Sequence, residues 1–305
     1  MKRFAMLWAP AAVLALGLAG CQEKQGAGEI AGPVSGNSIS GIGLQAVPFL
    51  EGGGRGEVYT LSNESGGNSV LRFFRSASGA LDPAGSFATG GKGTGSGLAS
   101  QGAIFRGERY IYAVNGGSND ISVLAEDGGR LRIVSRIPSG GTQPVSLTVQ
   151  GDLLFVLNAG GSGNIAGFRG AERGVLSPLP GSTKSLSGPA TQPAEVAFSP
   201  DGRALVVTEK ATNTIDTYEV RGYGGISGPL VQNSAGHTPY GFAFSRQGRL
   251  VVSEVEDKAP GGSTLSSYRL VHDGALKIIS GKVPDGQTAA CWVAITDDGK
   301  FAYTT

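Results

Sequence analysis

Few side chains in this sequence could do acid–base chemistry: two carboxylates that end apolar runs and one histidine in a loop. Glu209 ends the run "ALVVTE", Glu254 ends the run "RLVVSE", and His237 stands in "SAGHTPYGF". A carboxylate and an imidazole can move protons near neutral pH, so Glu209 and His237 are the candidate catalytic pair. No Ser-His-Asp spacing or metal-ligand cluster surrounds them. We therefore predict no metal site and no cofactor.

The two carboxylates occupy a position that recurs along the chain. Apolar runs end at five anchor residues, Asn63, Asn115, Asn158, Glu209 and Glu254. An oxygen at the end of a strand can accept hydrogen bonds from nearby backbone, which both Asn and Glu satisfy. The functional alternative is that Glu209 and Glu254 face a central channel and bind a ligand or a hard cation such as Ca²⁺.

Other candidates stand at the starts of apolar runs. Gln143 begins "QPVSLTV" and Gln192 begins "QPAEVAF". With Glu254, they are the predicted ligand-binding residues. His272, in "LVHDGAL", precedes a predicted outer turn and is expected at the surface.

The stretch "TGGKGTGSG", residues 89–97, has the composition of a phosphate-binding loop. That loop needs Gly-Lys followed directly by Ser or Thr at the start of a helix. Lys92 is followed by Gly93, and no helical pattern comes next. The stretch is therefore expected to be a flexible connection between sheets.

The anchor residues recur every ~45 to 50 residues, a spacing typical of propeller blades. Turns such as "SPDGR" at Ser199, "SRQGR" at Ser245 and "TDDGK" at Thr296 keep the same register. Asp-Gly and Gln-Gly turns supply the positive φ that a tight hairpin needs. Each repeat supplies about four short strands, and neighbouring sheets must stack to bury their faces. We predict an all-β propeller of four-stranded blades over residues 56–305, with a sixth repeat cut in mid-strand and the C-terminus truncated.

Residues 192–218 carry Pro-x-x-Val-x-Phe-Ser-Pro-Asp-Gly-Arg, then Thr-Glu, then Asn-Thr-Ile-x-x-Tyr. This pattern resembles the lactonase family of seven-bladed propellers, which includes 6-phosphogluconolactonases and 3-carboxymuconate cyclases, and the related propellers with Tyr-Val-Thr-Asn repeats. The resemblance covers about residues 56–305 and implies seven blades in the complete protein. One fold hosts many functions, so the resemblance is more specific for architecture than for chemistry.

The family's basic residues are missing at the matching positions. Residues 142–146, Thr-Gln-Pro-Val-Ser, stand where the resemblance implies Pro-His-Pro-His-Ser. Ala194 and Glu195 stand where it implies Arg and His, and Glu209 matches its acidic residue. A carboxylate without cationic partners cannot stabilise an oxyanion. We therefore predict a binding protein for a small ligand, glycan or protein, with a lactone hydrolase or muconate-cyclase-like enzyme using Glu209 and His237 as the alternative.

The first residues, "MKRFAMLWAPAAVLALGLAGCQ", have a charged start, an apolar stretch and a small-residue end. This pattern predicts an export signal over residues 1–20. Leu-Ala-Gly-Cys resembles a bacterial lipobox, which implies a lipid on Cys21 and a membrane-anchored, extracytoplasmic protein. Gln22 implies the periplasmic face of the outer membrane if the source is Gram-negative. Residues 21–55 would be the lipidated cysteine and a Gly/Ser-rich tether.

The chain carries 25 basic and 24 acidic side chains, so its charge is nearly balanced. This balance gives no electrostatic basis for binding nucleic acid. The sequence contains two cysteines. If Cys21 carries lipid, Cys291 has no disulfide partner, and we expect Cys291 to be a small buried apolar residue.

Overall fold

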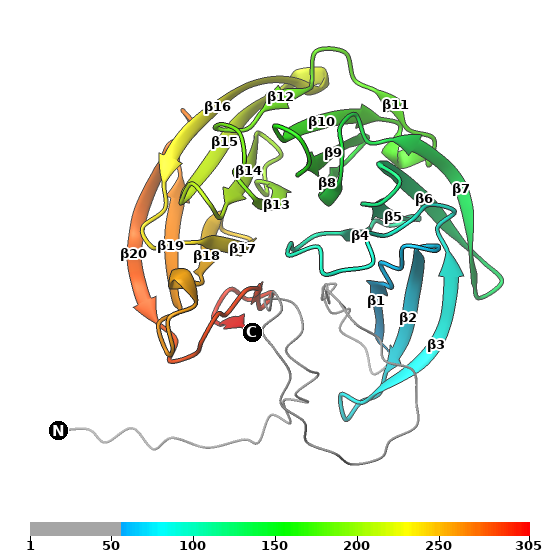
Figure 1. Cartoon of the computed structure of the whole chain (residues 1–305), viewed down its shortest axis with the longest axis horizontal. Coiled ribbons are helices and arrows are strands. Elements are labelled where there is room, and N and C mark those ends of the chain that lie inside the picture. The colour runs from blue at the N-terminus through cyan, green and yellow to red at the C-terminus, as the bar shows by residue number, and fades with distance from the viewer. Residues whose placement is uncertain (1–55) are drawn as a thin grey trace.

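The computed structural model describes residues 56–305, in which strands form six antiparallel sheets arranged around a common axis (Figure 1). This arrangement confirms the predicted all-β propeller. The three short 3₁₀ turns of this region are η1 (Ala171–Arg173), η2 (Gly222–Gly224) and η3 (Glu256–Lys258). Between residues 56 and 305, no helix is long and apolar enough to span a bilayer. The predicted signal peptide, lipidated Cys21 and tether lie outside the described residues.

Each complete sheet follows the chain order from the inner strand to the outer strand. The first sheet has β1 (Gly56–Leu61), β2 (Ser69–Arg75) and β3 (Leu81–Ala88). The second has β4 (Ile104–Arg106), β5 (Tyr110–Asn115), β6 (Asp120–Asp127) and β7 (Arg130–Pro138). The third has β8 (Pro144–Gln150), β9 (Leu153–Asn158), β10 (Asn164–Arg169) and, on its outer side, β11 (Ser177–Pro178) and β12 (Lys184–Ser185).

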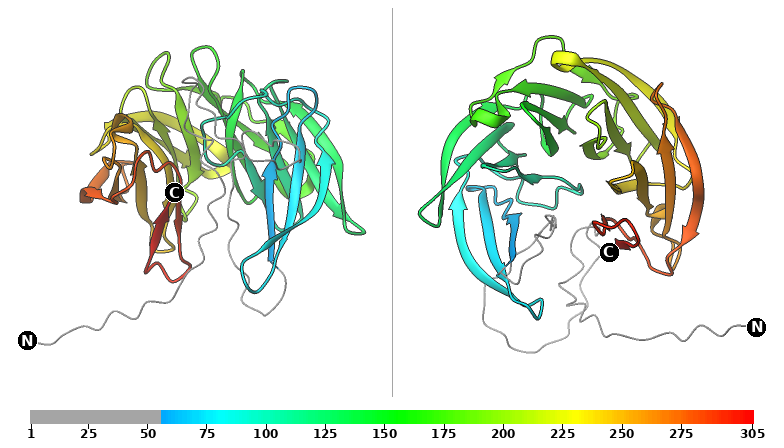
Figure 2. Two further views of the ribbon diagram at one scale, coloured as in Figure 1. Left: turned by 60° about the horizontal axis from the view of Figure 1, so that its bottom comes forward. Right: turned by 180° about the vertical axis from the view of Figure 1, so that it is seen from behind.

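The fourth and fifth sheets have the predicted four strands. The fourth has β13 (Pro193–Phe198), β14 (Ala204–Glu209), β15 (Thr214–Arg221) and β16 (Gly225–Asn233). The fifth has β17 (Pro239–Phe244), β18 (Arg249–Glu254), β19 (Thr264–Leu270) and β20 (Leu276–Pro284). The sixth has β21 (Val293–Ile295) and β22 (Ala302–Thr304). Figure 2 shows the first and sixth sheets at the two ends of the arc.

The repeated turns form as their sequences predict. Gly202, Gly248 and Gly299 all have positive φ, between 69° and 78°. In the fourth sheet, the Ser199 hydroxyl accepts a hydrogen bond from the Ala204 N–H at 3.0 Å, which closes the hairpin between the inner strand and its neighbour. The turn chemistry therefore fixes the register of these hairpins.

The core lies between neighbouring sheets. Inner strands of adjacent sheets contact each other, as β8 contacts β13 and β13 contacts β17. Large side chains from the third strands, including Phe168, Tyr218 and Tyr268, are fully buried in these interfaces. Burial of such apolar surface is the main favourable term in folding, and here it also holds the sheets in their radial order.

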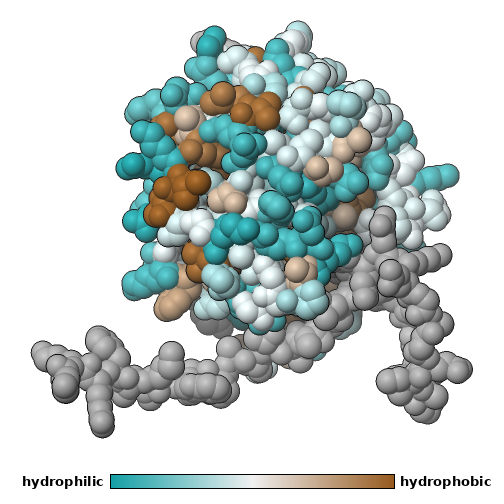
Figure 3. All heavy atoms as spheres, turned by 60° about the vertical axis from the view of Figure 1, so that its left-hand side comes forward, coloured by the Kyte–Doolittle hydropathy of each residue, from teal (hydrophilic) through white to brown (hydrophobic). Residues whose placement is uncertain are grey.

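The outer strands face solvent, and some of their apolar side chains are exposed. Figure 3 shows apolar side chains scattered among polar ones on the side of the molecule formed by β16 and β20. The exposed large apolar residues of these two strands are Leu230, Val231, Ile278, Ile279 and Val283. Apolar residues scattered in this way are normal on a protein surface.

Candidate functional site

All the predicted site residues within the described chain lie at one end of the propeller, which we call the mouth. The reason is topological: the inner strand starts where the second strand ends. Pro144 pairs with Asn158, Pro193 with Glu209 and Pro239 with Glu254. The starts of inner strands and the ends of second strands therefore share one edge of every sheet.

Glu209 is completely buried and its carboxylate is surrounded by donors. It accepts hydrogen bonds from the Ser187 N–H at 3.0 Å and from the hydroxyls of Thr212 and Thr214 at 2.8 and 2.9 Å. The Ser187 hydroxyl also donates to it. Both oxygens are therefore used by this chain's own groups.

Glu254 has the same environment in the next sheet and is also completely buried. It accepts hydrogen bonds from the Gly236 N–H at 2.8 Å and the Ser234 hydroxyl at 3.0 Å. The hydroxyls of Thr264 and Ser266 donate at 2.7 and 2.8 Å. The structure therefore does not bring Glu209 and Glu254 together, because each carboxylate sits in its own network.

Four of the five anchor residues make one common connection. Each bonds to a residue that follows the outer strand of the preceding sheet. The pairs are Asn115 with Thr89, Asn158 with Ser139, Glu209 with Ser187 and Glu254 with Ser234. The anchor residues thus tie neighbouring sheets together near the mouth.

Asp216, next to Glu209, is the exception to this complete pairing. It is fully buried and neither of its carboxylate oxygens has a hydrogen-bond partner in the described chain. Burial and the adjacent Glu209 charge raise the pKa of Asp216 to about 8. The equivalent residue of the fifth sheet is Ser266, whose hydroxyl donates to Glu254.

His237, Gln143 and Gln192 are exposed at the mouth. The His237 Nδ1 lies 3.3 Å from Asp257 Oδ2, and 57% of the histidine side chain is exposed. Gln143 and Gln192 have φ of 54° and 50°, in the left-handed region. Each of them stands at the sharp turn where the chain enters an inner strand. His237 thus has no bond to the Glu209 carboxylate, and the predicted catalytic pair does not share a hydrogen bond. His272 is exposed, as expected.

The centre of the propeller is crossed by residues 98–102, which we call the channel segment. The segment leads into β4 and lies inside the ring of sheets (Figure 1). It bonds to the inner strands of four other sheets, through Val145 and Leu147 of β8, Ala194 of β13, Phe242 of β17 and Val293 of β21. A segment that touches so many inner strands occupies the axis at this depth.

Gln101, in the channel segment, bonds to a residue 192 positions further along the chain. Its side-chain amide donates to the Phe242 carbonyl at 3.1 Å and accepts from the Val293 N–H at 3.1 Å. A Cβ on Gly241 would lie 2.3 Å from the Gln101 Oε1, so glycine is needed there for the approach. Gln101 was missed by sequence reasoning. The available signal is that it is a long polar residue where the third, fourth and fifth sheets carry Pro144, Pro193 and Pro239.

Residues 89–97 connect the first sheet to the second as predicted, and buried contacts hold part of this connection. Thr89 is buried and its hydroxyl donates to Asn115 Oδ1 at 2.7 Å. The Thr94 N–H donates to Asn63 Oδ1 at 3.0 Å, and a Cβ on Gly93 would lie 2.1 Å from the Asn63 backbone. The glycines allow close packing of this segment against the anchor residues.

Lys210 and Tyr240 are the other residues that sequence reasoning missed. The Lys210 amine donates to the Ala99 carbonyl at 2.6 Å and lies 4.6 Å from the centre of the Tyr240 ring. Burial lowers the pKa of Lys210 to about 8. The Tyr240 side chain is buried, and its hydroxyl has no hydrogen-bond partner in the described chain.

Glu195 lies in the channel wall where the resemblance implies a histidine. Its Oε2 accepts a hydrogen bond from the Phe242 N–H at 2.7 Å. Burial raises the pKa of Glu195 well above its usual range. Burial thus disfavours the charged form of this carboxyl.

Cys291 is buried in an apolar cluster with Tyr240, and this confirms the expectation that it is a small buried apolar residue. Cys291 is also disulfide-bonded, whereas the sequence predicts no disulfide partner for it if Cys21 carries lipid. The chain has two cysteines, and the other, Cys21, lies outside the described residues. A lipid on the Cys21 thiol and a disulfide that uses it exclude each other.

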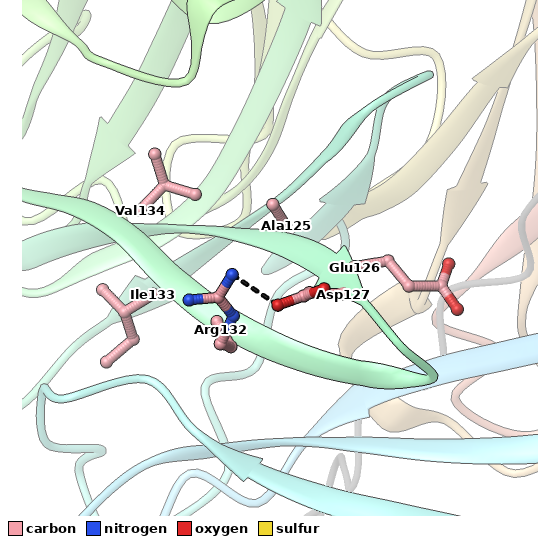
Figure 4. Close-up of a pocket in the computed structure, with 6 residues that line it drawn as sticks. All are labelled: Ala125, Glu126, Asp127, Arg132, Ile133 and Val134. Atoms are coloured by element: carbon pink, nitrogen blue, oxygen red, sulfur yellow. Dashed lines mark ion pairs between the residues drawn. The ribbon is translucent and has the colours of Figure 1, made fainter.

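A surface hollow of about 420 Å³ lies away from the mouth, on the outer strands of the second sheet. Figure 4 shows its lining residues, with an ion pair between Arg132 and Asp127. Both side chains are more than half exposed. Across residues 56–305, no group of three or more His, Cys, Asp or Glu side chains is placed to hold a metal ion.

Radially arranged antiparallel sheets with anchor residues at one edge define a β-propeller. Residues 175–259 match the family described as lactonase, 7-bladed β-propeller. The resemblance to lactonase-family propellers is thus confirmed, through this segment by sequence and through the remaining sheets by fold. No curated protein matches the chain.

Solved structures share the fold at low identity. A putative 6-phosphogluconolactonase from Bacteroides uniformis has a TM-score of 0.65 and 14% identity, covering 85% of this chain and 76% of its own. The Pseudomonas aeruginosa periplasmic gluconolactonase has a TM-score of 0.60 and 18% identity, covering 81% and 74%. Virginiamycin B lyase from Staphylococcus aureus has a TM-score of 0.53 and 16% identity, covering 82% and 73%. These differently named proteins show that the fold alone does not set the reaction.

Proposed function

We propose that this protein is an exported, lipid-anchored propeller that binds a small ligand, a glycan or a protein partner at its mouth. One observation carries the proposal: the channel segment fills the axis, while Gln143, Gln192 and His237 are exposed around it. A ligand would then contact the mouth and its loops rather than pass through the ring. Binding sites on propellers of this kind are built from loops held by a rigid scaffold.

The binding proposal can be tested on the full-length protein with a glycan array and a panel of small sugar acids and lactones. His237→Ala combined with Gln192→Asn changes two exposed mouth side chains, and Asn tolerates the positive φ at position 192. We expect this variant to lose binding while its melting temperature stays near that of the wild type. Arg132→Ala, at the outer hollow, is the matched control and should bind normally. Equal binding by all three proteins would contradict a mouth site.

The anchoring part of the proposal rests on the export signal and the Leu-Ala-Gly-Cys sequence. Radioactive palmitate fed to a bacterial host should label the wild type, and Cys21→Ser should remove the label. Mass spectrometry of peptides without reduction gives the opposing result. An unlabelled protein with a disulfide-linked Cys291 peptide would replace the lipid anchor with a disulfide.

The alternative, a lactone hydrolase using Glu209 and His237, requires a direct assay because two of the three fold neighbours described above are named as lactonases. The binding proposal expects no turnover of gluconolactone or related lactones by the wild type. Hydrolysis that Glu209→Gln abolishes without lowering the melting temperature would support the enzyme instead. The buried and fully bonded state of Glu209 favours a structural role for this carboxylate.

A further inference from the structure

Lys210 is a partly buried cation without a counter-ion in the described chain. Its amine has the Ala99 carbonyl and the face of the Tyr240 ring as neighbours, and no ion pair joins it within residues 56–305. An ammonium group removed from water is costly unless it is paired, and a single carbonyl with a ring face offsets part of that cost. The amine has three donors, so it can bind further acceptors.

The Tyr240 hydroxyl, on the neighbouring sheet, is a second group in need of an acceptor. The residue is 5% exposed and its hydroxyl has no hydrogen-bond partner in the described chain. Buried phenol groups usually find a partner, because leaving such a donor unpaired costs about 1 to 3 kcal/mol. The Lys210 amine lies 4.6 Å from the centre of the Tyr240 ring, so an ammonium and a phenol O–H belong to one small region, and both favour an anionic oxygen.

The acidic groups near this pair do not meet that need. Glu209 precedes Lys210 in the chain, but its oxygens accept bonds from Ser187, Thr212 and Thr214. The Glu195 carboxyl is bonded to Phe242, and burial raises its pKa well above its usual range. Neither carboxylate therefore forms a hydrogen bond or an ion pair with the Lys210 amine in the described chain.

The channel segment shows which kind of atom accepts hydrogen bonds from donors in this region. Its Ala99 carbonyl takes the Lys210 amine, and its Ser100 carbonyl takes the Trp292 indole N–H at 3.3 Å. Trp292 is half-buried and packs with Tyr240 in the same apolar cluster. Lys210 and Trp292 thus bind oxygens of this chain's own backbone beside an apolar wall.

We propose that Lys210 and Tyr240 form a subsite at the mouth for the carboxylate of a small organic acid. One carboxylate oxygen accepts from the Lys210 amine and the other from the Tyr240 hydroxyl, while Trp292 lines the side of the site. The subsite rests on the proposed ligand-binding function and gives it a ligand class. Charge-assisted hydrogen bonds are the stronger kind, so loss of either donor should weaken binding measurably.

The reactivity of the amine itself provides the test. Trace labelling of the full-length protein with acetic anhydride, followed by peptide mass spectrometry, measures each lysine's free amine as pH changes. The probes are sodium acetate, benzoate and D-gluconate, with sodium chloride at equal ionic strength to control for screening. Lys277 is exposed and serves as the internal reference.

At least one carboxylate should protect Lys210 with a saturable dose dependence, while Lys277 is unaffected. Tyr240→Phe removes only the hydroxyl and should weaken this protection about tenfold. Melting temperatures check that the variant folds, and the wild-type labelling needs no variant at all. Protection of Lys210 by chloride equal to that by every carboxylate would overturn the proposal, as would undiminished protection in Tyr240→Phe.

The two proposals can fail separately. If a glycan or protein binds at the mouth but no carboxylate protects Lys210, the mouth site stands and the carboxylate subsite is wrong. If nothing binds at the mouth and Lys210 is also unprotected, both are wrong.

Discussion

Glu209 and Lys210 are neighbours in the chain, yet their surroundings are opposite. Glu209 belongs to the network of anchor residues, where every oxygen has donors and the neighbouring sheets are tied together. Lys210 lies at the channel segment with a carbonyl, a ring face and no counter-ion in the described chain. Two charged residues at adjacent positions therefore point to two different roles.

The difference teaches how to separate structural from functional polar groups in this propeller. A buried charge whose bonds are all made within the fold is explained by the fold. A buried charge that keeps unused donors is costly to the fold and needs another explanation. By this criterion the carboxylates suggested by the sequence are structural, and Lys210 with Tyr240 is the better candidate site.

Removal of an anchor carboxylate should give the largest effect. Glu254→Ala leaves the Gly236 N–H and three hydroxyls without their acceptor. We expect the free energy of unfolding to fall by about 3 kcal/mol or more, because buried unpaired donors are expensive. Urea denaturation of the full-length protein measures this. Glu219→Ala, at an exposed position, should change it far less. Similar values for both variants would mean that Glu254 does not hold the sheets together.

Crowding of the segment around residue 93 should give the next largest effect. In Gly93→Ala the new methyl group would lie 2.1 Å from the Asn63 backbone. A shift of that backbone should cost about 2 kcal/mol, as overpacking usually does. Gly66→Ala has nothing within 4 Å of the new methyl and is the matched control. An unchanged melting temperature for Gly93→Ala would support the interpretation of residues 89–97 as a flexible loop.

The sequence predicted the features that repeat locally. Turns with Gly202 and Gly248, alternating strands and the anchor positions recur at similar spacing, and each depends on contacts within a few residues. Their repetition predicts stacked sheets because one such sheet cannot bury both faces alone. The resemblance to the lactonase family added the correct fold.

The rest depends on contacts that no local pattern contains. Gln101 meets Val293 across 192 positions, and Lys210 meets Ala99 across 111. From the sequence, a lysine directly after an anchor residue is expected to be exposed in a loop. In the structure it contacts the channel segment and the Tyr240 ring. The sequence therefore predicts a site at the repeated carboxylates, whereas Lys210 and Tyr240, which keep unused hydrogen-bonding capacity, do not recur in the repeat.

Replacement of Asp216 by serine should add a hydrogen-bond donor to the network around Glu209. Burial and the Glu209 charge raise the pKa of Asp216 to about 8 from an unfolded value of about 3.9. The folded protein then holds a proton that the unfolded chain has lost, so stability falls as pH rises between about 4 and 8. Asp216→Ser copies Ser266 of the fifth sheet and supplies a donor to Glu209.

We expect Asp216→Ser to be more stable than the wild type at pH 8, and the advantage to shrink toward pH 4. Denaturation curves of both proteins across this range test the prediction. Asp152→Ser, at a partly exposed carboxylate outside this network, controls for loss of charge alone. An advantage that is equal at both ends of the range would exclude protonation of Asp216 as its cause.

Lys210 should give a pH dependence of stability whose sign is opposite to that of Asp216. Burial lowers its folded pKa to about 8, against about 10.4 in the unfolded chain. Between these values the unfolded chain binds more protons, so the wild type gains stability as pH rises from about 8 to 10.4. Lys210→Met keeps the length of the side chain but cannot titrate, so the stability of the wild type relative to this variant should rise across the window. Lys277→Met, at the exposed reference position, should show no such slope. A flat difference for Lys210 would mean that its amine is as well solvated as a surface lysine, and the contrast with Glu209 would then vanish.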